Sequence, residues 1–367
     1  MTLKDKNLYY VGGVVRDEIL GTQSFDTDFC YEGNAIEYAR KSGLNIIKEN
    51  PDFGTVRVTP PQTSPSRECD PSIDIASTRE ETYPQAGHLP VIKNIGCSLK
   101  NDLKRRDFTI NAMAKNTVTG DIIDYFGGIK DIRNKKLKVL HSKSFIDDPT
   151  RILRGLKFAV RFGFELDDET KKLQDDYLDN INYDMSYHRL KKELKETFNL
   201  NKEEAYKKFI EQGIYKLLGG NITPSQYFPS REGVSALIDK YKPYKPWLVW
   251  LGFFDLSNLE LTGEEQKIID SIPNVKPKNN FETYKLFNNL PLETVLLYAL
   301  SIDYDIAINY LDRLKNIKIK TTGKDLKQLG IPNGKIYKEI FDFLLEEKIK
   351  NPQTDEIKLV KEKYGFI

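Results

Sequence analysis

The chain has 367 residues, of which 30% are charged and 39% are hydrophobic, and its formal net charge at pH 7 is +2. This length suffices for two or three domains, and the small net charge excludes a strongly basic overall surface, so any polyanion must be bound by local patches. The three cysteines form no CxxC pair, and the sequence has neither an apolar signal region nor an apolar run long enough to span a membrane. We therefore expect a cytoplasmic protein that makes no contact with membranes.

The residues up to about 145 alternate short β-like runs with helical patterns, which indicates an α/β region. After that point apolar residues recur at helical spacing, for example in "RILRGLKFAVRF" and "LETVLLYALSI". The sequence therefore predicts an α+β protein in which a mixed sheet of about five strands, with helices packed on it, precedes an all-α region. Strands are expected at 7–11, 25–31, 44–50, 55–59, 72–77 and 121–126, helices at 14–21, 35–43 and 99–114, and loops at 60–71 and 79–94.

Paired glycines follow the first predicted strand. Gly12 and Gly13 come directly before a helix whose first turn contains Arg16. In such a turn the backbone N–H groups and the helix N-terminus can face an anion, and the arginine adds a charge-assisted contact. An ordinary tight turn with a surface arginine fits the same pattern, so the glycine pair alone does not decide between them.

Two aspartates lie two residues apart in the next predicted strand. Side chains alternate along a strand, so Asp26 and Asp28 leave the same face, and two like charges so close favour a cation between them. Asp74 lies between Ile73 and Ile75 in another predicted strand and points away from their apolar face. Three carboxylates on neighbouring strands beside a phosphate-binding turn predict a two-metal site for phosphoryl chemistry, whereas solvated carboxylates on an edge strand are the alternative.

The segment "LKRRDFTINAMA" begins with three cations, Lys104, Arg105 and Arg106. Three positive charges in the first turn of a helix are unfavourable against the helix dipole, so a polyanion is expected to neutralise them. Asp107 and Asn111 are four residues apart and would share one face of that helix.

The segment "SFIDDPTRILRGLKFAVRFGF" combines a helix start with a regular charge pattern. Pro149 suits the first helical turn, with Asp147 or Asp148 near the N-cap. Asp148, Arg151 and Arg154 then recur every three residues along one face. A capped helix with an Asp–Arg pair worth about 0.3–0.5 kcal/mol explains this pattern. The alternative is that an aspartate acceptor beside an arginine fork recognises the edge of a nucleobase.

These motifs, in this order, resemble the class II tRNA nucleotidyltransferases, or CCA-adding enzymes, which share a fold with bacterial poly(A) polymerases in the polymerase-β-like nucleotidyltransferase superfamily. The matching segments are "VGGVVRDEILG…DTD", "IDIASTR", "LKRRDFTINAMA", "DYFGGIKDI" and "DDPTRILRGLKFAVRFGF". In addition, "MSYHRLKKELKETF" resembles the neck motif of the family, and 322–347 resembles its C-terminal tRNA-binding segment. The resemblance implies a catalytic head at 1–145, a nucleobase-selecting neck at 146–200, a helical body at 201–300 and a tRNA-binding helical tail at 301–367.

The resemblance also implies a role for each motif residue. Asp26 and Asp28 would hold two Mg²⁺ ions, and Asp74 would be the third catalytic carboxylate. Asp148 and Arg151 would form the amino-acid template that pairs with the incoming C or A. Nucleotide-binding roles would fall on Gly12, Gly13, Arg16, Arg105, Arg106, Asp107, Asn111, Asp148, Arg151 and Arg154. The family usually has Glu-Asp where this chain has Asp147–Asp148, and we expect Asp147 to brace Arg151 without loss of activity.

The activity implied is template-independent addition of CCA, from CTP and ATP, to the 3′ end of tRNA with release of pyrophosphate, and without DNA as a partner. Addition of only the final A to a CC-ended tRNA stays open. Enzymes that add only CC have lost part of the loop between the third carboxylate and "RRD", which this chain keeps. Poly(A) polymerases usually have a longer, more basic form of the "DDPTR" motif and a long basic tail, and neither is present. A non-catalytic RNA-binding protein is disfavoured because all three carboxylates are retained.

A lysine-rich segment at 313–330 is the expected contact for the phosphates of the tRNA acceptor arm, with Lys324 and Lys327 as candidate residues. A solvated helix-and-turn face is the alternative.

Overall fold

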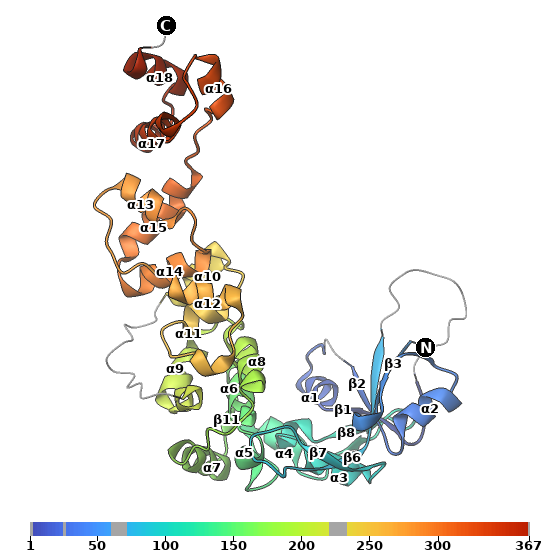
Figure 1. Ribbon diagram of the computed structural model, residues 1–367. Helices are drawn as coiled ribbons and strands as arrows, with labels where there is room; N and C mark the ends of the chain where they lie inside the picture. Colours follow the sequence, from blue (N-terminus) through green and yellow to red (C-terminus); the bar gives the residue numbers. More distant parts are fainter. Residues whose placement is uncertain (1–2, 25–26, 60–71, 220–232, 366–367) are drawn as a thin grey trace. The chain divides into compact units, whose positions relative to one another are not determined.

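The computed structural model describes residues 3–24, 27–59, 72–219 and 233–365. The chain divides into two compact units, Met1–Ile222 with Ser257–Glu260, and Thr223–Leu256 with Leu261–Ile367. The first unit contains the sheet and the helices that follow it, and the described elements of the second unit are helical (Figure 1). None of the described helices is long and apolar enough to cross a membrane. The four-part division expected from the sequence stays a prediction.

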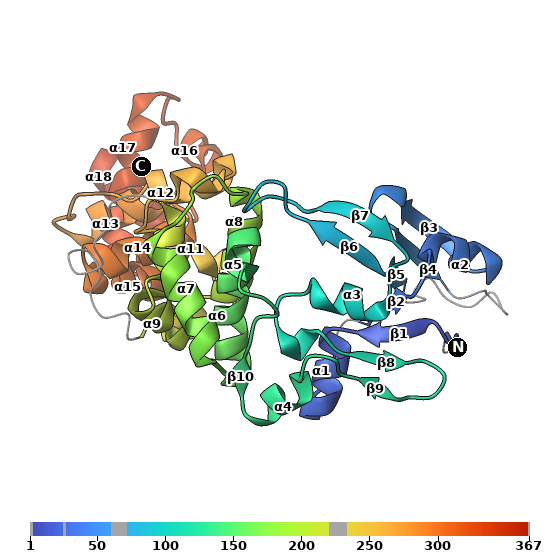
Figure 2. The same ribbon diagram turned by 90° about the horizontal axis from the view of Figure 1, so that it is seen from below.

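A seven-stranded mixed sheet, with the strand order β3-β4-β5-β2-β1-β8-β9, forms the part of the first unit called the head below (Figure 2). The pairing of β2 with β5 is parallel and the other pairings are antiparallel. The expected mixed sheet is therefore confirmed, with seven strands where about five were expected. Its strands are β1 (Leu8–Val11), β2 (Asp28–Tyr31), β3 (Asn45–Asn50), β4 (Thr55–Thr59), β5 (Ile73–Ser77), β8 (Ala114–Asn116) and β9 (Ile122–Ile123).

The two faces of the sheet differ because side chains alternate along each strand. Phe29, Val56, Val58 and Ile75 are buried in a core that also contains residues of α2 (Ala35–Lys41). The opposite face is divided, because Tyr9, Val11 and Cys30 pack there against Leu99 and Leu103, whereas Asp28, Arg57 and Asp74 form a polar part beside them. Helix α2 thus covers the apolar face, and the carboxylates predicted to be catalytic are left on the other.

The helices of the first unit include two that match the ones expected at 14–21 and 35–43. Besides α2, they are α1 (Gly13–Leu20), α3 (Leu99–Lys104), α4 (Gly128–Arg133), α5 (Ser144–Asp147), α6 (Thr150–Phe162), α7 (Asp168–Asp179), α8 (Tyr187–Phe198) and α9 (Glu203–Glu211), with short 3-10 helices η1 (Pro51–Phe53), η2 (Thr109–Asn111), η3 (Ile214–Leu218) and η5 (Ser257–Leu259). Helices α5 to α8, called the neck below, include α6 and α8, which pack against each other. A two-stranded sheet of β10 (Lys136–Leu137) and β11 (Glu165–Leu166) joins head and neck.

Two expectations from the sequence were wrong. The segment 79–94, expected to be a loop, begins a hairpin of β6 (Arg79–Thr82) and β7 (Val91–Ile95), whose polar residues conceal the strand pattern. The predicted helix at 99–114 ends at Lys104. Beyond it every residue from Asp107 to Ala114 is buried, whereas an amphipathic α-helix would bury one face only, and the backbone there forms the 3-10 helix at 109–111 and the start of β8. The expected loop at 60–71 lies outside the described residues.

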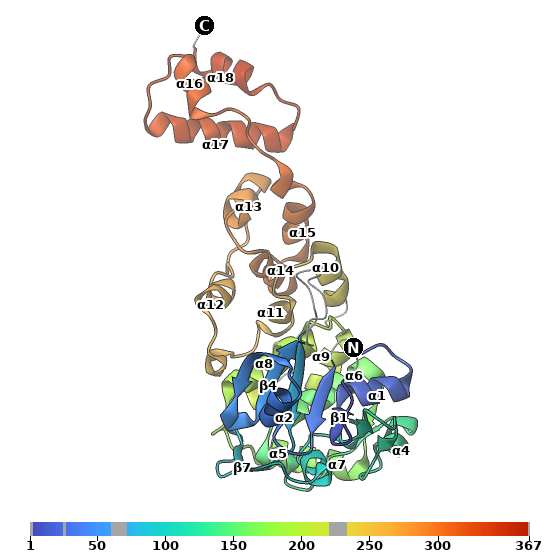
Figure 3. The ribbon, with the colours of Figure 1, turned by 90° about the vertical axis from the view of Figure 1, so that its right-hand side faces the viewer.

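The second unit contains α10 (Val234–Tyr241), α11 (Pro246–Leu251), α12 (Gly263–Asp270), α13 (Asn280–Phe287), α14 (Leu292–Ser301), α15 (Tyr304–Asp312), η6 (Leu314–Asn316), α16 (Gly323–Gln328), α17 (Lys335–Lys350) and α18 (Glu356–Tyr364). Figure 3 shows α16, α17 and α18 gathered side by side, around a core that includes Leu326, Ile340, Leu344 and Val360. Lys324 and Lys327 are exposed on α16. Their contact with RNA stays a prediction.

A buried ion pair fixes the segment before α16 to α17 and α18. Lys348 Nζ lies 2.8 Å from Glu356 Oε1, with side chains 8% and 5% exposed. The Glu356 carboxylate also accepts hydrogen bonds from the backbone N–H groups of Lys320 and Thr321. Burial raises the pKa of Glu356, but the bonds from Lys348 and the two N–H groups outweigh it and lower the pKa to about 2.

Replacement of this glutamate, Glu356→Gln, is expected to lower the free energy of unfolding at pH 7 by about 2–3 kcal/mol, because Lys348 is left buried without a counter-charge. Urea denaturation would measure the change. Glu362→Gln, on the exposed side of the same helix, is the matched control and should lie within about 0.5 kcal/mol of the wild type. Equal stability of Glu356→Gln and the control would contradict this account.

Candidate active site

The carboxylates of Asp28 and Asp74 leave the polar face of the head sheet from neighbouring strands. The two residues are direct partners in the parallel register of β2 and β5. Asp26 lies outside the described residues, and within them no group of three or more His, Cys, Asp and Glu side chains is placed to hold a metal ion. Two neighbouring carboxylates supply hard oxygen ligands of the kind that Mg²⁺ prefers, so the residues present fit a divalent cation.

The Asp74 carboxylate is held by an arginine that the sequence reasoning missed. Arg57 Nε and Nη2 donate to the two Asp74 oxygens at 2.8 and 2.7 Å. These bonds lower the pKa of Asp74, against a smaller opposite effect of partial burial. The signal was present in "TVRVT", because the arginine lies between two buried valines and so must leave the same face as Asp74.

The glycine turn borders a pocket of about 700 Å³ between head and neck. Gly12 has a φ of 70°, which favours glycine, and a Cβ there would lie 3.1 Å from Arg106 Nη1. Arg106 Nε is buried without a hydrogen-bond partner among the described residues. The two glycines have no side chains, and Arg106 keeps an unused N–H donor beside them. The turn is therefore suited to bind an oxyanion.

All ten residues predicted to bind the nucleotide line this one pocket, although they come from segments far apart in the sequence. Asp28 lines it too, whereas Asp74 lines an adjoining pocket of about 470 Å³ that shares Asp28 and Arg106 with the first. Sequence reasoning missed several charged lining residues, namely Arg79, Glu81, Lys157, Arg161, Arg189, Lys192 and Glu193. Arginine and lysine outnumber carboxylates around the pocket, as binding of a polyphosphate requires.

The cations of "LKRRD" have an internal counter-charge that the sequence argument overlooked. Asp102, fully buried in α3, accepts from Arg105 Nη2 at 2.8 Å and from Arg106 Nη2 at 3.1 Å. Burial raises the pKa of Asp102, but the two arginines outweigh it and hold the pKa below its ordinary value. Arg105 also lies 3.1 Å from Glu81. Asp102 thus orients both guanidinium groups, and the expected neutralisation of the three cations by a polyanion stays a prediction.

A buried polar network joins the glycine helix of the head to α6 of the neck. Arg16 Nη1 donates to Asn111 Oδ1 at 2.7 Å, and Asn111 Nδ2 donates to Asp107 Oδ1 at 3.0 Å. Asp107 Oδ2 accepts from Arg154 Nη2 at 2.6 Å. Burial raises the pKa of Asp107, but Arg154 and the hydrogen bonds from Asn111 and the Phe108 N–H lower it to about 2. Four predicted nucleotide-binding residues are thus positioned by one another.

The low pKa of Asp107 implies acid-sensitive stability. Its ordinary value is 3.8, so ionised Asp107 contributes about 2 kcal/mol at neutral pH. Because the folded-state pKa is lowered, this stability is present above about pH 4 and lost as the pH falls towards 2. Urea denaturation from pH 7 to pH 3 should show the gap in stability between wild type and Asp107→Asn narrowing below pH 4. A gap that stays constant would refute the assignment, and exposed Asp121→Asn serves as the control.

The predicted template residues lie at the start of α6, each oriented by a different set of partners. Asp148 Oδ1 accepts from the N–H and hydroxyl of Thr150, at 3.2 and 2.6 Å, and its Oδ2 accepts from Arg189 of α8. Arg151 donates to Ser144 Oγ at 2.7 Å and to the Arg105 carbonyl at 2.9 Å. A carboxylate has about four acceptor positions, so Asp148 keeps one for a ligand.

Asp147 contacts the template through a histidine. Its Oδ2 lies 3.9 Å from His141 Nδ1, and His141 Nε2 lies 3.5 Å from Arg151 Nη1. Burial raises the pKa of Asp147, and burial together with the charge of Arg151 lowers the pKa of His141. The arrangement is compatible with the expectation that Asp147 braces Arg151, which stays a prediction.

Known proteins are similar to this chain in sequence and in fold. Residues 8–138 match the model of the poly(A) polymerase head domain. An A-adding tRNA nucleotidyltransferase of Aquifex aeolicus is 32% identical, over 94% of this chain and 45% of that protein. The solved structure of the Thermotoga maritima CCA-adding enzyme complexed with tRNA superposes with a TM-score of 0.76 at 27% identity, covering 98% of this chain and 90% of that one. The chain is therefore similar, over nearly its whole length, to tRNA nucleotidyltransferases, and its head matches the poly(A) polymerase head domain.

These similar proteins differ in length. The chain spans less than half of the Aquifex protein, but 82% of an A-adding tRNA nucleotidyltransferase of Halalkalibacterium halodurans, which is 28% identical over 91% of this chain. The predicted fold class, a nucleotidyltransferase head followed by a helical region, is confirmed by the match to the Thermotoga structure.

Proposed function

We propose that this protein extends the 3′ end of tRNA, adding the terminal adenosine from ATP with release of pyrophosphate. The observation that carries the proposal is the position of Asp28. It lies at the border of two adjoining pockets, one lined by all the predicted nucleotide-binding residues and the other by Asp74. Transfer of a nucleotidyl group to a hydroxyl requires that the two reactants bind on either side of one carboxylate pair.

Asp28, with Asp26 from the undescribed residues, would hold the two Mg²⁺ ions that the sequence motif predicts, and Asp74 would complete the set. Bound there, divalent cations stabilise the charge that develops on the transferred phosphoryl group. Nucleotidyltransferases generally use divalent metal ions.

The chain's own groups would bind and orient both reactants. The N–H groups of the Gly12–Gly13 turn, with Arg16 and Arg106, would bind the triphosphate, and the Asp107–Asn111 pair would bind the ribose, since all of these residues line the larger pocket. Because Arg57 lowers the pKa of Asp74, this side chain is a carboxylate at neutral pH. It orients the attacking 3′-hydroxyl by accepting a hydrogen bond, and strong proton abstraction is not expected of it.

Selection of the base follows from the donor and acceptor order at α6. Asp148 accepts, and Arg151 donates. Adenine and cytosine present an amino donor beside a ring-nitrogen acceptor, which matches this order, whereas guanine and uracil present the reverse. Each mismatched group would leave a buried donor or acceptor unpaired, at a cost of about 1–3 kcal/mol.

Addition of the complete CCA is the second candidate function. One observation favours addition of A alone, and another favours addition of CCA. The sequence relatives described above, matched over more than 90% of this chain, are named A-adding enzymes. The Thermotoga structure, matched over 98% of the chain, is named a CCA-adding enzyme. The template pairs with both A and C, so it does not decide between them.

Three tRNA transcripts, ending before CC, after CC and after CCA, would be incubated with Mg²⁺ and CTP, ATP or both. Growth of the CC-ended transcript by one residue with ATP is the expected result. Growth of the first transcript by three residues with both nucleotides would show full CCA addition, and its failure to grow would show A addition alone. Continued growth of all three with ATP would instead show a poly(A) polymerase, and growth of none would refute the proposal.

A further inference from the structure

A row of four charged residues crosses the polar face of the head sheet. Register pairs Lys48 of β3 with Arg57 of β4, Arg57 with Asp74 of β5, and Asp74 with Asp28 of β2. Because direct partners across strands share a face, the four side chains form one line, with two cations followed by two carboxylates. Neighbouring strands lie about 4.8 Å apart, so Arg57 and Lys48 extend the line roughly 5 and 10 Å beyond Asp74.

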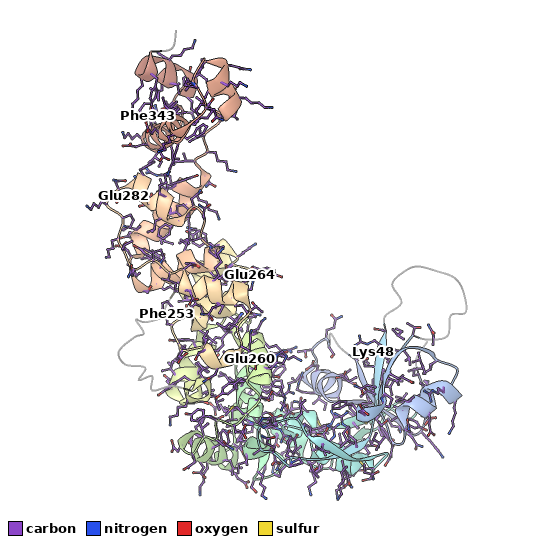
Figure 4. The ribbon with its side chains drawn as sticks, in the orientation of Figure 1. Lys48, Phe253, Glu260, Glu264, Glu282 and Phe343 are labelled. Atoms are coloured by element: carbon purple, nitrogen blue, oxygen red, sulfur yellow. The ribbon has the colours of Figure 1, made fainter. Side chains whose placement is uncertain are left out.

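This line borders the pocket of about 470 Å³ that adjoins the nucleotide pocket, and all four residues are among its lining residues. Lys48 is exposed on the head (Figure 4), and it has no ion pair within the part of the chain that the structure describes. Glu49, which also lines the pocket, is held by Arg40 at 2.8 Å. The cationic end of the row is therefore available to a ligand.

The occupant of this pocket follows from the proposed function, on which the inference rests. The incoming nucleotide fills the larger pocket, bounded by the glycine turn and α6. Asp28 stands between the pockets, so the strand that carries the attacking hydroxyl must reach Asp74 from the smaller one. We propose that Lys48 and Arg57 form a subsite for the last phosphodiester groups of the RNA whose 3′-hydroxyl is extended.

Arg57 suits this position for a chemical reason. A guanidinium fork binds carboxylate and phosphate in the same bidentate geometry. With Asp74 as its partner, Arg57 fixes the orientation of that carboxylate, and the exposed half of both side chains leaves room for a phosphate alongside. Arg57 is thus a positioning residue for Asp74 as well as a phosphate contact, whereas Lys48, two strands from Asp74, serves the phosphate alone.

The test compares Lys48→Gln and Arg57→Gln with wild type on CC-ended tRNA and ATP. For Lys48→Gln, the KM for tRNA should rise about 5- to 10-fold, while the KM for ATP and kcat stay within about twofold. Arg57→Gln should raise the KM for tRNA and also lower kcat, because Asp74 loses its partner. The control is Lys41→Gln, on α2 across the apolar face, whose side chain is 80% exposed and should leave all three constants unchanged.

Equilibrium binding of the same tRNA without ATP, from 50 to 300 mM KCl, gives a second measurement that needs no turnover. Loss of one phosphate contact should make the slope of log K against log salt shallower by about 0.7 in each variant. Unchanged tRNA KM and slope in both variants would overturn the subsite. An equal rise in the KM for ATP would overturn it too, since these residues would then bind the triphosphate. If wild type extends no tRNA, the proposed function fails, and the salt slopes still decide on the subsite.

Discussion

Asp28→Asn is expected to abolish nucleotide addition, with a fall in kcat on the order of 10³-fold or more. The change removes one negative charge at the border of the two pockets while keeping the size of the side chain. A group that stabilises charge only in the transition state lowers kcat when it is lost and leaves substrate binding largely intact. Single-turnover extension of CC-ended tRNA, with the Kd for ATP measured separately, would separate chemistry from binding.

Exposed Asp121, in the turn between β8 and β9, provides the matched control Asp121→Asn. This variant should retain full activity. Wild-type rates in Asp28→Asn would show that the carboxylate pair on β2 and β5 has no catalytic role, and the proposed site would then be withdrawn. A weaker affinity for ATP at an unchanged rate of chemistry would give Asp28 a binding role only.

Arg151→Gln is expected to relax base selection, reducing the preference for ATP over GTP by roughly 5- to 150-fold. The expected range corresponds to loss of about 1–3 kcal/mol from one hydrogen-bonded group in the template. Arg151 already donates to Ser144 and to the Arg105 carbonyl, so its orientation is fixed before a base arrives. The ratio of kcat/KM for ATP to that for GTP, on CC-ended tRNA, measures the effect.

The control for Arg151→Gln is a variant in which Arg151 is unchanged. Arg133→Gln, at the exposed end of α4, removes the same charge away from the pocket and should keep the preference of the wild type. Equal losses of kcat/KM for ATP and GTP in Arg151→Gln, with their ratio unchanged, would contradict base recognition. Arg151 would then serve only to hold the neck against the head.

The sequence predicted the parts of the site that lie within single motifs. Asp28 and Asp74 were assigned to one face of two strands, because alternation along a strand is a local rule. That the strands are neighbours in parallel register is a property of the whole sheet, and local patterns contain no information on it. The same limit explains the missed partners. Arg57 and Arg189 contact Asp74 and Asp148 only after segments 17 and 41 residues apart come together.

Errors of the sequence analysis arose where burial overrides periodicity. The segment from Arg105 to Ala114 has helix-forming residues. Phe108, Ile110 and Met113 are nevertheless each fully buried, and the backbone there forms a 3-10 helix and the start of a strand instead of an α-helix. The hairpin of β6 and β7 has few apolar residues to indicate strands. The hairpin is held instead by backbone pairing between its two strands and by contacts with the neck, such as the hydrogen bond from the Ser186 N–H to the Gly87 carbonyl.

The most direct measurement of the central claim is the mass of a CC-ended tRNA before and after incubation with the protein, Mg²⁺ and ATP, with pyrophosphate assayed in the same reaction. Addition of one adenylate to each tRNA, with one pyrophosphate released and neither product formed by Asp28→Asn, is the result that we predict. An unchanged mass with wild-type protein, or equal products with Asp28→Asn, would contradict the account.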